Sequence, residues 1–241
     1  MMIINYSVII STLNSCNDLK FTIENLKKNN SKSFEVIVID GNSSDDTISY
    51  LKKESFISNW ISENDKGIYD AWNKGLNLAK GKWIMFLGAG DTIKQDLFLN
   101  YDRLVTTSKK KNDFIFCKIQ IGNRVIDSNW NWEKFRKYMN IPHCGGIHNR
   151  EYFENHGMFN IKFKIAGDYE LLLRKKNELI VEKLNLIGVN MKEGGVSQNN
   201  LEVFLESRLA KKINNSQNLF WNNIFYIFTL IKHVIKKIIF K

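Results

Sequence analysis

The chain has 241 residues, 44% of them hydrophobic, and a single proline, so it is long enough for one large core and unsuited to long disordered linkers. Its three cysteines are far apart in the sequence, which excludes a zinc-binding spacing and a disulfide framework and is typical of a reducing compartment. A formal net charge of +10 favours an anionic partner such as a nucleotide, a nucleic acid or a membrane surface.

The first ninety residues alternate between short apolar runs and amphipathic stretches. Buried strands are predicted at residues 6–11, 34–39, 60–62 and 83–87. Helices are predicted from Asp18, from Ser43 to about residue 53, and over residues 68–80, where apolar residues form one continuous stripe. Such alternation indicates an α/β fold with a mostly parallel sheet and helices on both of its faces.

Beyond Asp91 the alternation becomes irregular. We expect a hairpin over residues 113–126, a short helix near 151–157, a helix over 168–176 and a strand over 181–189. The composition changes only past about residue 200. We therefore expect one folded domain over residues 1–205 and a tail over residues 206–241.

The tail is strongly basic, because no acid follows Glu206 whereas seven Lys or Arg residues do. Polar residues recur in it with helical spacing, at 222/223, 229, 232/233 and 236/237. This pattern predicts a basic amphipathic helix that lies in an anionic membrane interface. The alternative is a helix docked on the domain or on a second subunit, so a homodimer is a further expectation.

Three acids stand at predicted strand ends or helix starts, namely Asp40, Asp91 and Asp168. Ligands of open α/β sheets bind at the carboxyl ends of the strands, so Asp40 and Asp91 are expected to face one crevice. The alternative is that Asp40 is a turn residue and that Asp91 caps the following segment.

Four segments carry a resemblance to a known family. They are SVIISTLN (residues 7–14), VIDGNSSDDT (38–47), DKGIYDAWNKGLNLAKGKWIMFLGAGD (65–91) and FKIAGDYELLLR (163–174). In this order they resemble family 2 glycosyltransferases, especially bacterial enzymes that build surface polysaccharides, over roughly residues 5–200. The resemblance implies a GT-A fold, a nucleotide-binding sandwich whose enzymes transfer a sugar with inversion from a nucleotide-diphosphate donor.

The resemblance assigns the donor site first to the early loops. Thr12 and Asn14 would line the base and ribose pocket. Asp40 would accept a hydrogen bond from a pyrimidine N–H, which points to a UDP-sugar, and Gly41 and Ser43 would shape that turn. Asp45 is expected to cap a helix instead.

The 65–91 segment would cross the donor crevice. Lys66 would offset phosphate charge and Gly67 would let the backbone approach the donor. Asp70 and Asn73 lie one turn apart, opposite the apolar stripe, and would point at ribose or sugar, unless they form a solvated helix face.

The GAGD stretch departs from the family's acidic pattern. Asp91 is the acid retained as ligand for Mg²⁺ or Mn²⁺, while Gly88 and the donor-side Gly90 stand where relatives often have a polar residue or an acid. One carboxylate can suffice if diphosphate oxygens and water complete the coordination of the ion. We therefore expect weak metal binding without the nucleotide.

Asp168 matches the family's catalytic base, which would accept the acceptor hydroxyl proton. Its position at a helix start stabilises a carboxylate, although a structural N-cap would look the same. Tyr169 and Glu170 would orient the acceptor, and His143 would contact phosphate or acceptor unless it is structural. Further expectations are phosphate contacts from Arg150 and Arg174 and a flexible loop at residues 194–197 that closes over the donor.

Together the motifs and the tail predict an inverting, metal-dependent glycosyltransferase that extends a glycan or a lipid-linked acceptor from the cytoplasmic side of the inner membrane. The alternatives are a catalytically inactive relative or a nucleotide- or nucleic-acid-binding α/β protein. Since the positive charge gathers in the tail and no basic-aromatic strand pair is evident, no nucleic-acid partner is expected.

Overall fold

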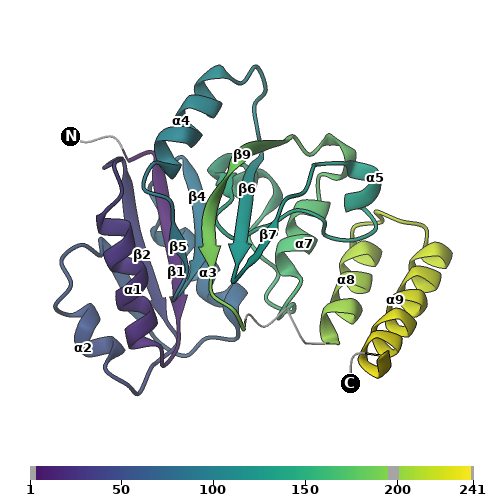
Figure 1. Cartoon of the computed structure of the whole chain (residues 1–241), viewed down its shortest axis with the longest axis horizontal. Coiled ribbons are helices and arrows are strands. Elements are labelled where there is room, and N and C mark those ends of the chain that lie inside the picture. Colours follow the sequence, from purple (N-terminus) through teal and green to yellow (C-terminus); the bar gives the residue numbers. More distant parts are fainter. Residues whose placement is uncertain (1–3, 195–200, 240–241) are drawn as a thin grey trace.

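The computed structural model describes residues 4–194 and 201–239, and it has one central sheet with helices on both faces (Figure 1). The strands are β1 (Tyr6–Thr12), β2 (Phe34–Asp40), β3 (Asn59–Ser62), β4 (Trp83–Gly88), β5 (Thr92–Ile93), β6 (Phe114–Ile121), β7 (Arg124–Ile126), β8 (Ile147–Asn149) and β9 (Val181–Met191). The helices are α1 (Cys16–Lys27), α2 (Thr47–Leu51), α3 (Ile68–Leu78), α4 (Leu97–Thr107), α5 (Trp132–Phe135), α6 (Arg150–His156), α7 (Gly167–Leu173), α8 (Glu202–Ile213) and α9 (Leu219–Ile239).

The sheet has the strand order β3-β2-β1-β4-β8-β6-β9-β5, with β7 paired to β6. It is parallel across β3, β2, β1 and β4, as predicted, and mixed beyond them, because β8 runs antiparallel to both β4 and β6. The register pairs Thr12 with Asp40 and Ser11 with Gly88. Three loops that follow parallel strands therefore leave the sheet at one edge.

Two hydrophobic layers hold the sheet. Along β1, Ile9 faces a core shared with α3, α6 and α7, whereas Val8 and Ile10 face a core shared with α1, α2 and α4. This division follows from the alternation of side chains along a strand. The approach of α3 to β1 is close, because a Cβ on Gly75 would lie 2.4 Å from Cγ2 of Ile9.

Several elements differ from the sequence-based expectations. The helix expected from Ser43 is shorter, since Ser43 and Asp45 are used in the preceding loop. Helix α4, helix α5 and strands β5 and β8 were not predicted. The last three are very short, whereas α4 has 11 residues and buries Leu97, Phe98 and Tyr101 on one face. The expected domain boundary at residue 205 falls inside α8. Of the expected loop at residues 194–197, only Gly194 lies within the described residues.

Helix α9 lies at the C-terminal end of the molecule, beside α8 (Figure 1). Among the described helices, none combines the length and apolar character that a membrane crossing needs. The side chains of the lysines at positions 232, 236, 237 and 241 lie outside the described part of the structure.

Candidate active site

The loops after β1 and β2 are joined by a buried carboxylate. Asp40 is completely buried, and its carboxylate accepts hydrogen bonds from the Ser43 N–H (2.9 Å), the Ser43 hydroxyl and the Ser62 hydroxyl (2.6 Å). The Ser43 hydroxyl in turn accepts from the Asn14 N–H at 2.7 Å. Asp40 therefore organises this turn, as the alternative anticipated, and has no exposed surface for direct contact with a base.

The remaining residues of this edge are arranged around that turn. Asn14 has a φ of 48°, and its side-chain oxygen accepts from the Ser44 N–H at 2.8 Å. The Thr12 hydroxyl is buried and has no hydrogen-bond partner among the described residues. A Cβ on Gly41 would lie 3.3 Å from an Asp65 carboxylate oxygen, so only a small residue lets the two loops pack. Thr12 and Asn14 thus stand together at the edge as expected.

Asp45 lies in the loop before α2, one residue before the N-cap position at Asp46, and its side chain links the starts of two helices. Its carboxylate accepts from the N–H of Thr47 in the first turn of α2 and from the N–H of Cys16 in the first turn of α1, each at 3.0 Å. These hydrogen bonds lower the pKa of Asp45 below its usual range.

The segment before α3 carries an exposed lysine on a strained backbone. Gly67 has a φ of 126°, in a region that side chains rarely adopt, and Lys66 beside it is exposed. The Asp70 carboxylate accepts from the Lys66 N–H at 2.9 Å and lies 3.5 Å from the Lys74 ammonium. The Lys66 hydrogen bond is the main reason that the pKa of Asp70 is lowered. Asp70 therefore fastens the start of α3 instead of pointing at a sugar.

Asn73 is also used inside the protein. Its side-chain nitrogen donates to the Phe159 carbonyl at 2.9 Å, and its oxygen accepts from the Phe159 N–H at 3.0 Å. This reciprocal pair ties α3 to the segment before Asp168. The expected contact of Asn73 with the donor is thus replaced by a structural one, because a side-chain amide matches both polar groups of a peptide unit.

Asp168 lies half-buried in the first turn of α7. Its Oδ1 accepts from the Tyr169 N–H at 2.8 Å and lies 3.2 Å from the Tyr69 hydroxyl, whose single proton also points to the Ile165 carbonyl at 2.7 Å. Within residues 4–194 and 201–239, no hydrogen bond reaches its Oδ2. Burial, together with the neighbouring Asp168 carboxylate, holds the pKa of Tyr69 well above its usual value, so Tyr69 remains a neutral donor.

A carboxylate that the sequence analysis did not single out holds the segment before Asp168. Glu206 of α8 accepts three backbone hydrogen bonds, each of 2.8 Å, from the N–H groups of Lys164, Ile165 and Ala166. The Lys164 ammonium donates to the Lys66 carbonyl, which brings this segment beside Gly67. The one available signal was that Glu206 is the last acid in a basic stretch of sequence.

Asp91 is 5% exposed, and both of its oxygens accept hydrogen bonds from the protein. Oδ1 accepts from the Lys192 N–H (2.9 Å), while Oδ2 accepts from the Gly88 N–H (2.9 Å) and the Cys144 thiol (3.2 Å). No group of three His, Cys, Asp or Glu side chains in the described residues could hold a metal ion. The donor set therefore does not form a metal site by itself. It fits a cation whose other ligands arrive with a diphosphate.

The two glycines of GAGD serve the fold of this loop. Gly88 allows Asp91 to turn back, since a Cβ at Gly88 would lie 3.3 Å from Oδ2 of Asp91. Gly90 has a φ of 99°, and a Cβ there would lie 2.5 Å from the Lys192 side chain. Gly90 is thus suited both to its backbone conformation and to the Lys192 side chain that lies over it, while Gly88 gives room to the Asp91 carboxylate.

His143 lies in the core. It is 7% exposed, its Nε2 lies 2.8 Å from Nε2 of His148, and its ring stacks on Trp72 and Phe114. Burial lowers the pKa of His143, an effect partly offset by the Asp168 carboxylate, and lowers that of His148 further. The structural alternative for His143 therefore holds, and its buried partner was not predicted.

Two other expected site residues are also interior. Tyr169 is 1% exposed and its hydroxyl donates to the Phe135 carbonyl at 2.7 Å, so it packs the core instead of orienting an acceptor. Arg150 donates to the carbonyls of Ala79 and Gly81 just after α3, which it caps. The expected phosphate contact of Arg150 is thus replaced by contacts with a helix C-terminus.

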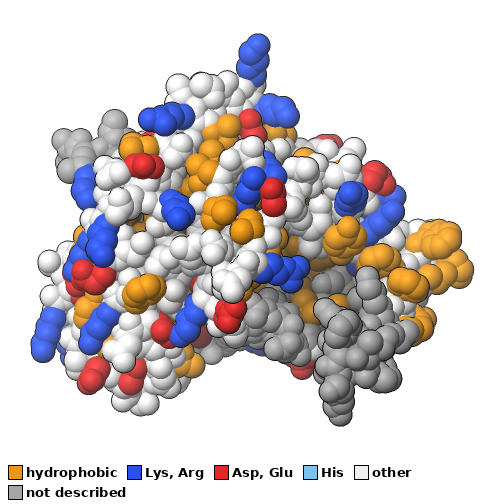
Figure 2. All heavy atoms as spheres, viewed as in Figure 1, with side chains coloured by type: hydrophobic (Ala, Val, Ile, Leu, Met, Phe, Trp, Pro, Cys, Tyr) orange, Lys and Arg blue, Asp and Glu red, His pale blue; other side chains and the backbone are white. Residues whose placement is uncertain are grey.

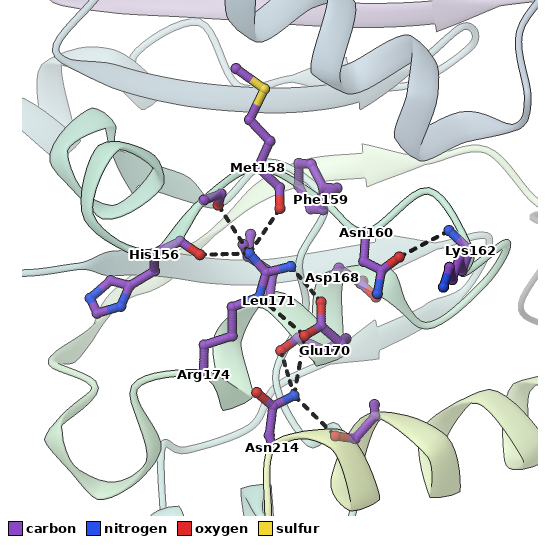
Figure 3. A network of polar contacts seen from close by, with 12 residues as sticks. His156, Met158, Phe159, Asn160, Lys162, Asp168, Glu170, Leu171, Arg174 and Asn214 are labelled. Atoms are coloured by element: carbon purple, nitrogen blue, oxygen red, sulfur yellow. Dashed lines mark hydrogen bonds and ion pairs between the residues drawn. The ribbon is translucent and has the colours of Figure 1, made fainter.

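Glu170 and Arg174 form a buried ion pair (Figure 3). Two guanidinium nitrogens of Arg174 donate to the two Glu170 oxygens, at 3.1 and 2.6 Å, and Asn214 at the end of α8 donates to Glu170 at 3.2 Å. Neither residue reaches the acceptor or phosphate side as expected. The pair instead ties α7 to α8 and to a loop through the carbonyls of His156, Gly157 and Met158.

The sheet and the loops at its strand ends have the GT-A fold of glycosyltransferases. The structure is similar to that of a Staphylococcus aureus TarS fragment in complex with UDP-GlcNAc, with a TM-score of 0.71 and 17% identity over 92% of this chain and 70% of that one. It is also similar to the mannosyltransferase PcManGT of Pyrobaculum calidifontis in complex with GDP-Man and Mn²⁺, with a TM-score of 0.61 and 14% identity over 95% and 75% of the two chains.

The sequence matches the family described as glycosyl transferase family 2 over residues 7–172, and the chain belongs to that family. It is 25% identical to a PGL/p-HBAD biosynthesis glycosyltransferase of Mycobacterium tuberculosis, over 80% of this chain and 78% of the relative. It is 27% identical to the Escherichia coli UDP-Glc:alpha-D-GlcNAc-diphosphoundecaprenol beta-1,3-glucosyltransferase WfaP, over 86% of each chain. The resemblance predicted from the four motifs is confirmed, and the protein is an enzyme of this class.

Proposed function

We propose that the protein is an inverting glycosyltransferase that moves a sugar from a nucleotide-diphosphate donor, UDP-sugar in the first instance, to a hydroxyl of a glycan or lipid-linked acceptor in cell-surface polysaccharide synthesis. The observation that carries this proposal is the Asp168 carboxylate: Oδ1 is held by the Tyr169 N–H, with the Tyr69 hydroxyl beside it, and no hydrogen bond within the described residues reaches Oδ2. UDP appears in the names of a relative and of a similar structure, which supports the donor class.

In the proposed reaction, Asp168 Oδ2 accepts the proton of the acceptor hydroxyl as its oxygen attacks the anomeric carbon of the donor. The bond between that carbon and the diphosphate oxygen breaks, and the electron pair leaves with the nucleoside diphosphate. Thr12 and Asn14 are proposed to contact the nucleotide, with Asp40 and Ser43 positioning the loop that carries them. Lys66, which is exposed next to Gly67, is proposed to offset diphosphate charge.

We propose Asp91 as the protein ligand of Mg²⁺ or Mn²⁺ that arrives with the donor. Such a cation offsets the charge on the leaving diphosphate. A solved structure of similar fold contains Mn²⁺ with a nucleotide sugar, which supports a divalent ion in general. The Lys192 and Gly88 N–H groups would keep the Asp91 carboxylate in place before the ion arrives.

The activity test uses Asp168→Asn, which keeps the shape of the side chain and removes its basicity. A thermal-shift screen of nucleotide sugars with Mn²⁺ identifies the donor, and transfer is then measured. We expect kcat to fall by about 10² or more, in line with removal of a general base, with donor affinity retained. The control is Asp127→Asn, an exposed carboxylate paired with Lys118 and Lys183. Wild-type turnover by Asp168→Asn would disprove the assignment of the base.

We also propose that the enzyme works as a peripheral protein at the cytoplasmic face of the inner membrane. In α9 the buried Asn222 donates to the Arg208 carbonyl of α8 at 3.0 Å, and the Arg208 guanidinium donates to Asn223 at 2.8 Å. Polar side chains thus face the protein, while Phe220 and Ile227 are 65% and 55% exposed. Hydrophobic side chains gather at this end of the molecule (Figure 2), and such a face suits a bilayer interface.

Flotation with vesicles that contain phosphatidylglycerol tests the membrane proposal. Phe220→Ser with Ile227→Ser should reduce the bound fraction strongly. The matched control is Phe21→Ser, because Phe21 of α1 is 62% exposed at another place on the surface. Equal flotation of wild type and the double variant would refute attachment through α9.

A further inference from the structure

A groove of about 470 Å³ runs between α9 and the residues that follow α5. Its volume falls in the range of about 300–1,000 Å³ typical of small-molecule sites. One wall is apolar and the opposite rim is cationic. The lining residues are Arg136, Lys137, Gln217, Asn218, Trp221, Ile224, Phe225 and Phe228.

The cationic rim is only partly neutralised. The Arg136 guanidinium pairs with Glu133 through Nε at 2.8 Å, and this glutamate is 65% exposed. Lys137 is exposed, and its ammonium forms no ion pair within the described residues. The groove lining contains no acid. An anionic group would therefore be attracted to this rim.

The apolar wall is held rigidly against the catalytic domain. The Tyr138 ring lies parallel to the Phe225 ring with centroids 6.3 Å apart. Lys211 of α8 donates to the Lys137 carbonyl at 3.0 Å and lies 4.9 Å from the centroid of Phe225. The groove is thus built by packing between α8, α9 and the 136–138 segment.

The groove is joined to the helix of Asp168 through the core. The Tyr169 hydroxyl donates to the buried Phe135 carbonyl, one residue before Arg136, and α8 packs against both α7 and α9.

We propose that the groove binds the lipid carrier of the acceptor, with its phosphate groups against Arg136 and Lys137 and its first hydrocarbon units against Trp221, Phe225 and Phe228. This inference rests on the proposed function, whose acceptor it specifies as a prenyl-type diphosphate. An amphiphile of this kind matches both the cationic rim and the apolar wall. A second copy of the chain matches the groove less well. Residues 207–241 carry seven Lys or Arg residues and no acid, so the tails of two copies would repel each other.

The test uses the full chain and farnesyl diphosphate as probe, with binding read from the fluorescence of Trp221. The signal of the Trp221→Phe variant is subtracted, which removes the other tryptophans and any binding at the donor site. We expect farnesyl diphosphate to bind at least tenfold more tightly than inorganic diphosphate or farnesol. Arg136→Gln with Lys137→Gln should weaken binding by about 10- to 100-fold. The control is Lys109→Gln with Lys110→Gln, an exposed pair after α4.

Three results would overturn the proposal. Equal binding of inorganic diphosphate would mean a general anion site. Unchanged affinity in the Arg136/Lys137 variant would remove the rim from recognition. Equal competition by phosphatidylglycerol vesicles would make bulk phospholipid the occupant. Since binding is measured without turnover, inactive enzyme that still binds farnesyl diphosphate would refute the proposed function and leave the groove assignment standing.

Discussion

Glu206→Gln should disconnect the segment before Asp168 from α8. The carboxylate of Glu206 accepts three N–H groups, and a glutamine side chain offers one acceptor oxygen and an NH₂ group that cannot accept. At least one N–H of residues 164–166 then loses its partner. A hydrogen bond to a charged group contributes about 1.5–3 kcal/mol, and the partial exposure of Glu206 places this case near the lower end. Local opening should therefore become about tenfold more frequent.

Two measurements follow from this loss. Amide hydrogen exchange of residues 164–166 should accelerate about tenfold, while exchange in β1 and β4 should not change. The kcat for sugar transfer should fall about tenfold or more with an unchanged donor KM, since a misplaced base affects the chemical step. Glu154→Gln, which removes an exposed carboxylate from α6, is the matched control. Its exchange and kcat should equal those of wild type.

A double-mutant cycle separates positioning from general destabilisation. If Glu206 acts through Asp168, adding Glu206→Gln to Asp168→Asn should cause no further loss of kcat. Additive losses, or exchange at residues 164–166 that stays at the wild-type rate, would refute the reasoning. A lower Tm alone would not account for a coupled loss of kcat.

The other predictions concern stability and metal binding. Burial lowers the pKa of His148 in the folded protein below the usual 6.5. Below pH 6.5 the unfolded chain takes up a proton at this histidine while the folded protein does not. The free energy of unfolding should therefore fall by about 1.4 kcal/mol per pH unit as the pH decreases below 6.5, for as long as the folded His148 stays neutral. Urea unfolding should show this loss of stability between pH 7 and pH 5, and the loss should be smaller in His148→Gln. The same dependence of unfolding free energy on pH in both proteins would contradict the assignment. Gly75→Ala should cost about 1–3 kcal/mol in thermal unfolding through overlap with Ile9, and an unchanged Tm would show that the α3–β1 contact yields easily. Calorimetry should detect Mn²⁺ binding only with UDP present and only with Asp91 intact, and saturable binding by the free enzyme would reveal ligands that this carboxylate does not supply.

The sequence predicted the first half of the fold well because each element there has a strong local period. The stripe of α3 and the apolar runs of β1, β2 and β4 require no knowledge of distant residues. Strand β8 has three residues, and its place between β4 and β6 depends on pairings with segments more than thirty residues away. Such long-range contacts leave little trace in a local pattern.

The sequence predicted the positions of the candidate site residues better than the role of each residue. Thr12, Asn14 and Asp168 lie where the motifs indicate, because strand ends and helix starts fix them. Asn73 and Glu170 have the residue types that recognise a sugar, yet each is used by a partner from a distant segment, Phe159 or Arg174. Residue type alone cannot distinguish these uses, since a carboxylate or amide binds a backbone group as well as it binds a substrate.

As a consequence, few polar side-chain groups at the carboxyl ends of the parallel strands are left without a hydrogen-bond partner among the described residues. Asp40, Asp70 and Asn73 form their hydrogen bonds within the protein. The Lys66 side chain stays exposed, and no hydrogen bond within the described residues reaches Asp168 Oδ2. Groups that are held in place before binding need not reorganise during the reaction, so the hydrogen bonds that fix these loops favour catalysis. Asp91 is held in the same way, because its carboxylate accepts from the Lys192 and Gly88 N–H groups, so in the proposed reaction a cation would reach a carboxylate that is already in place.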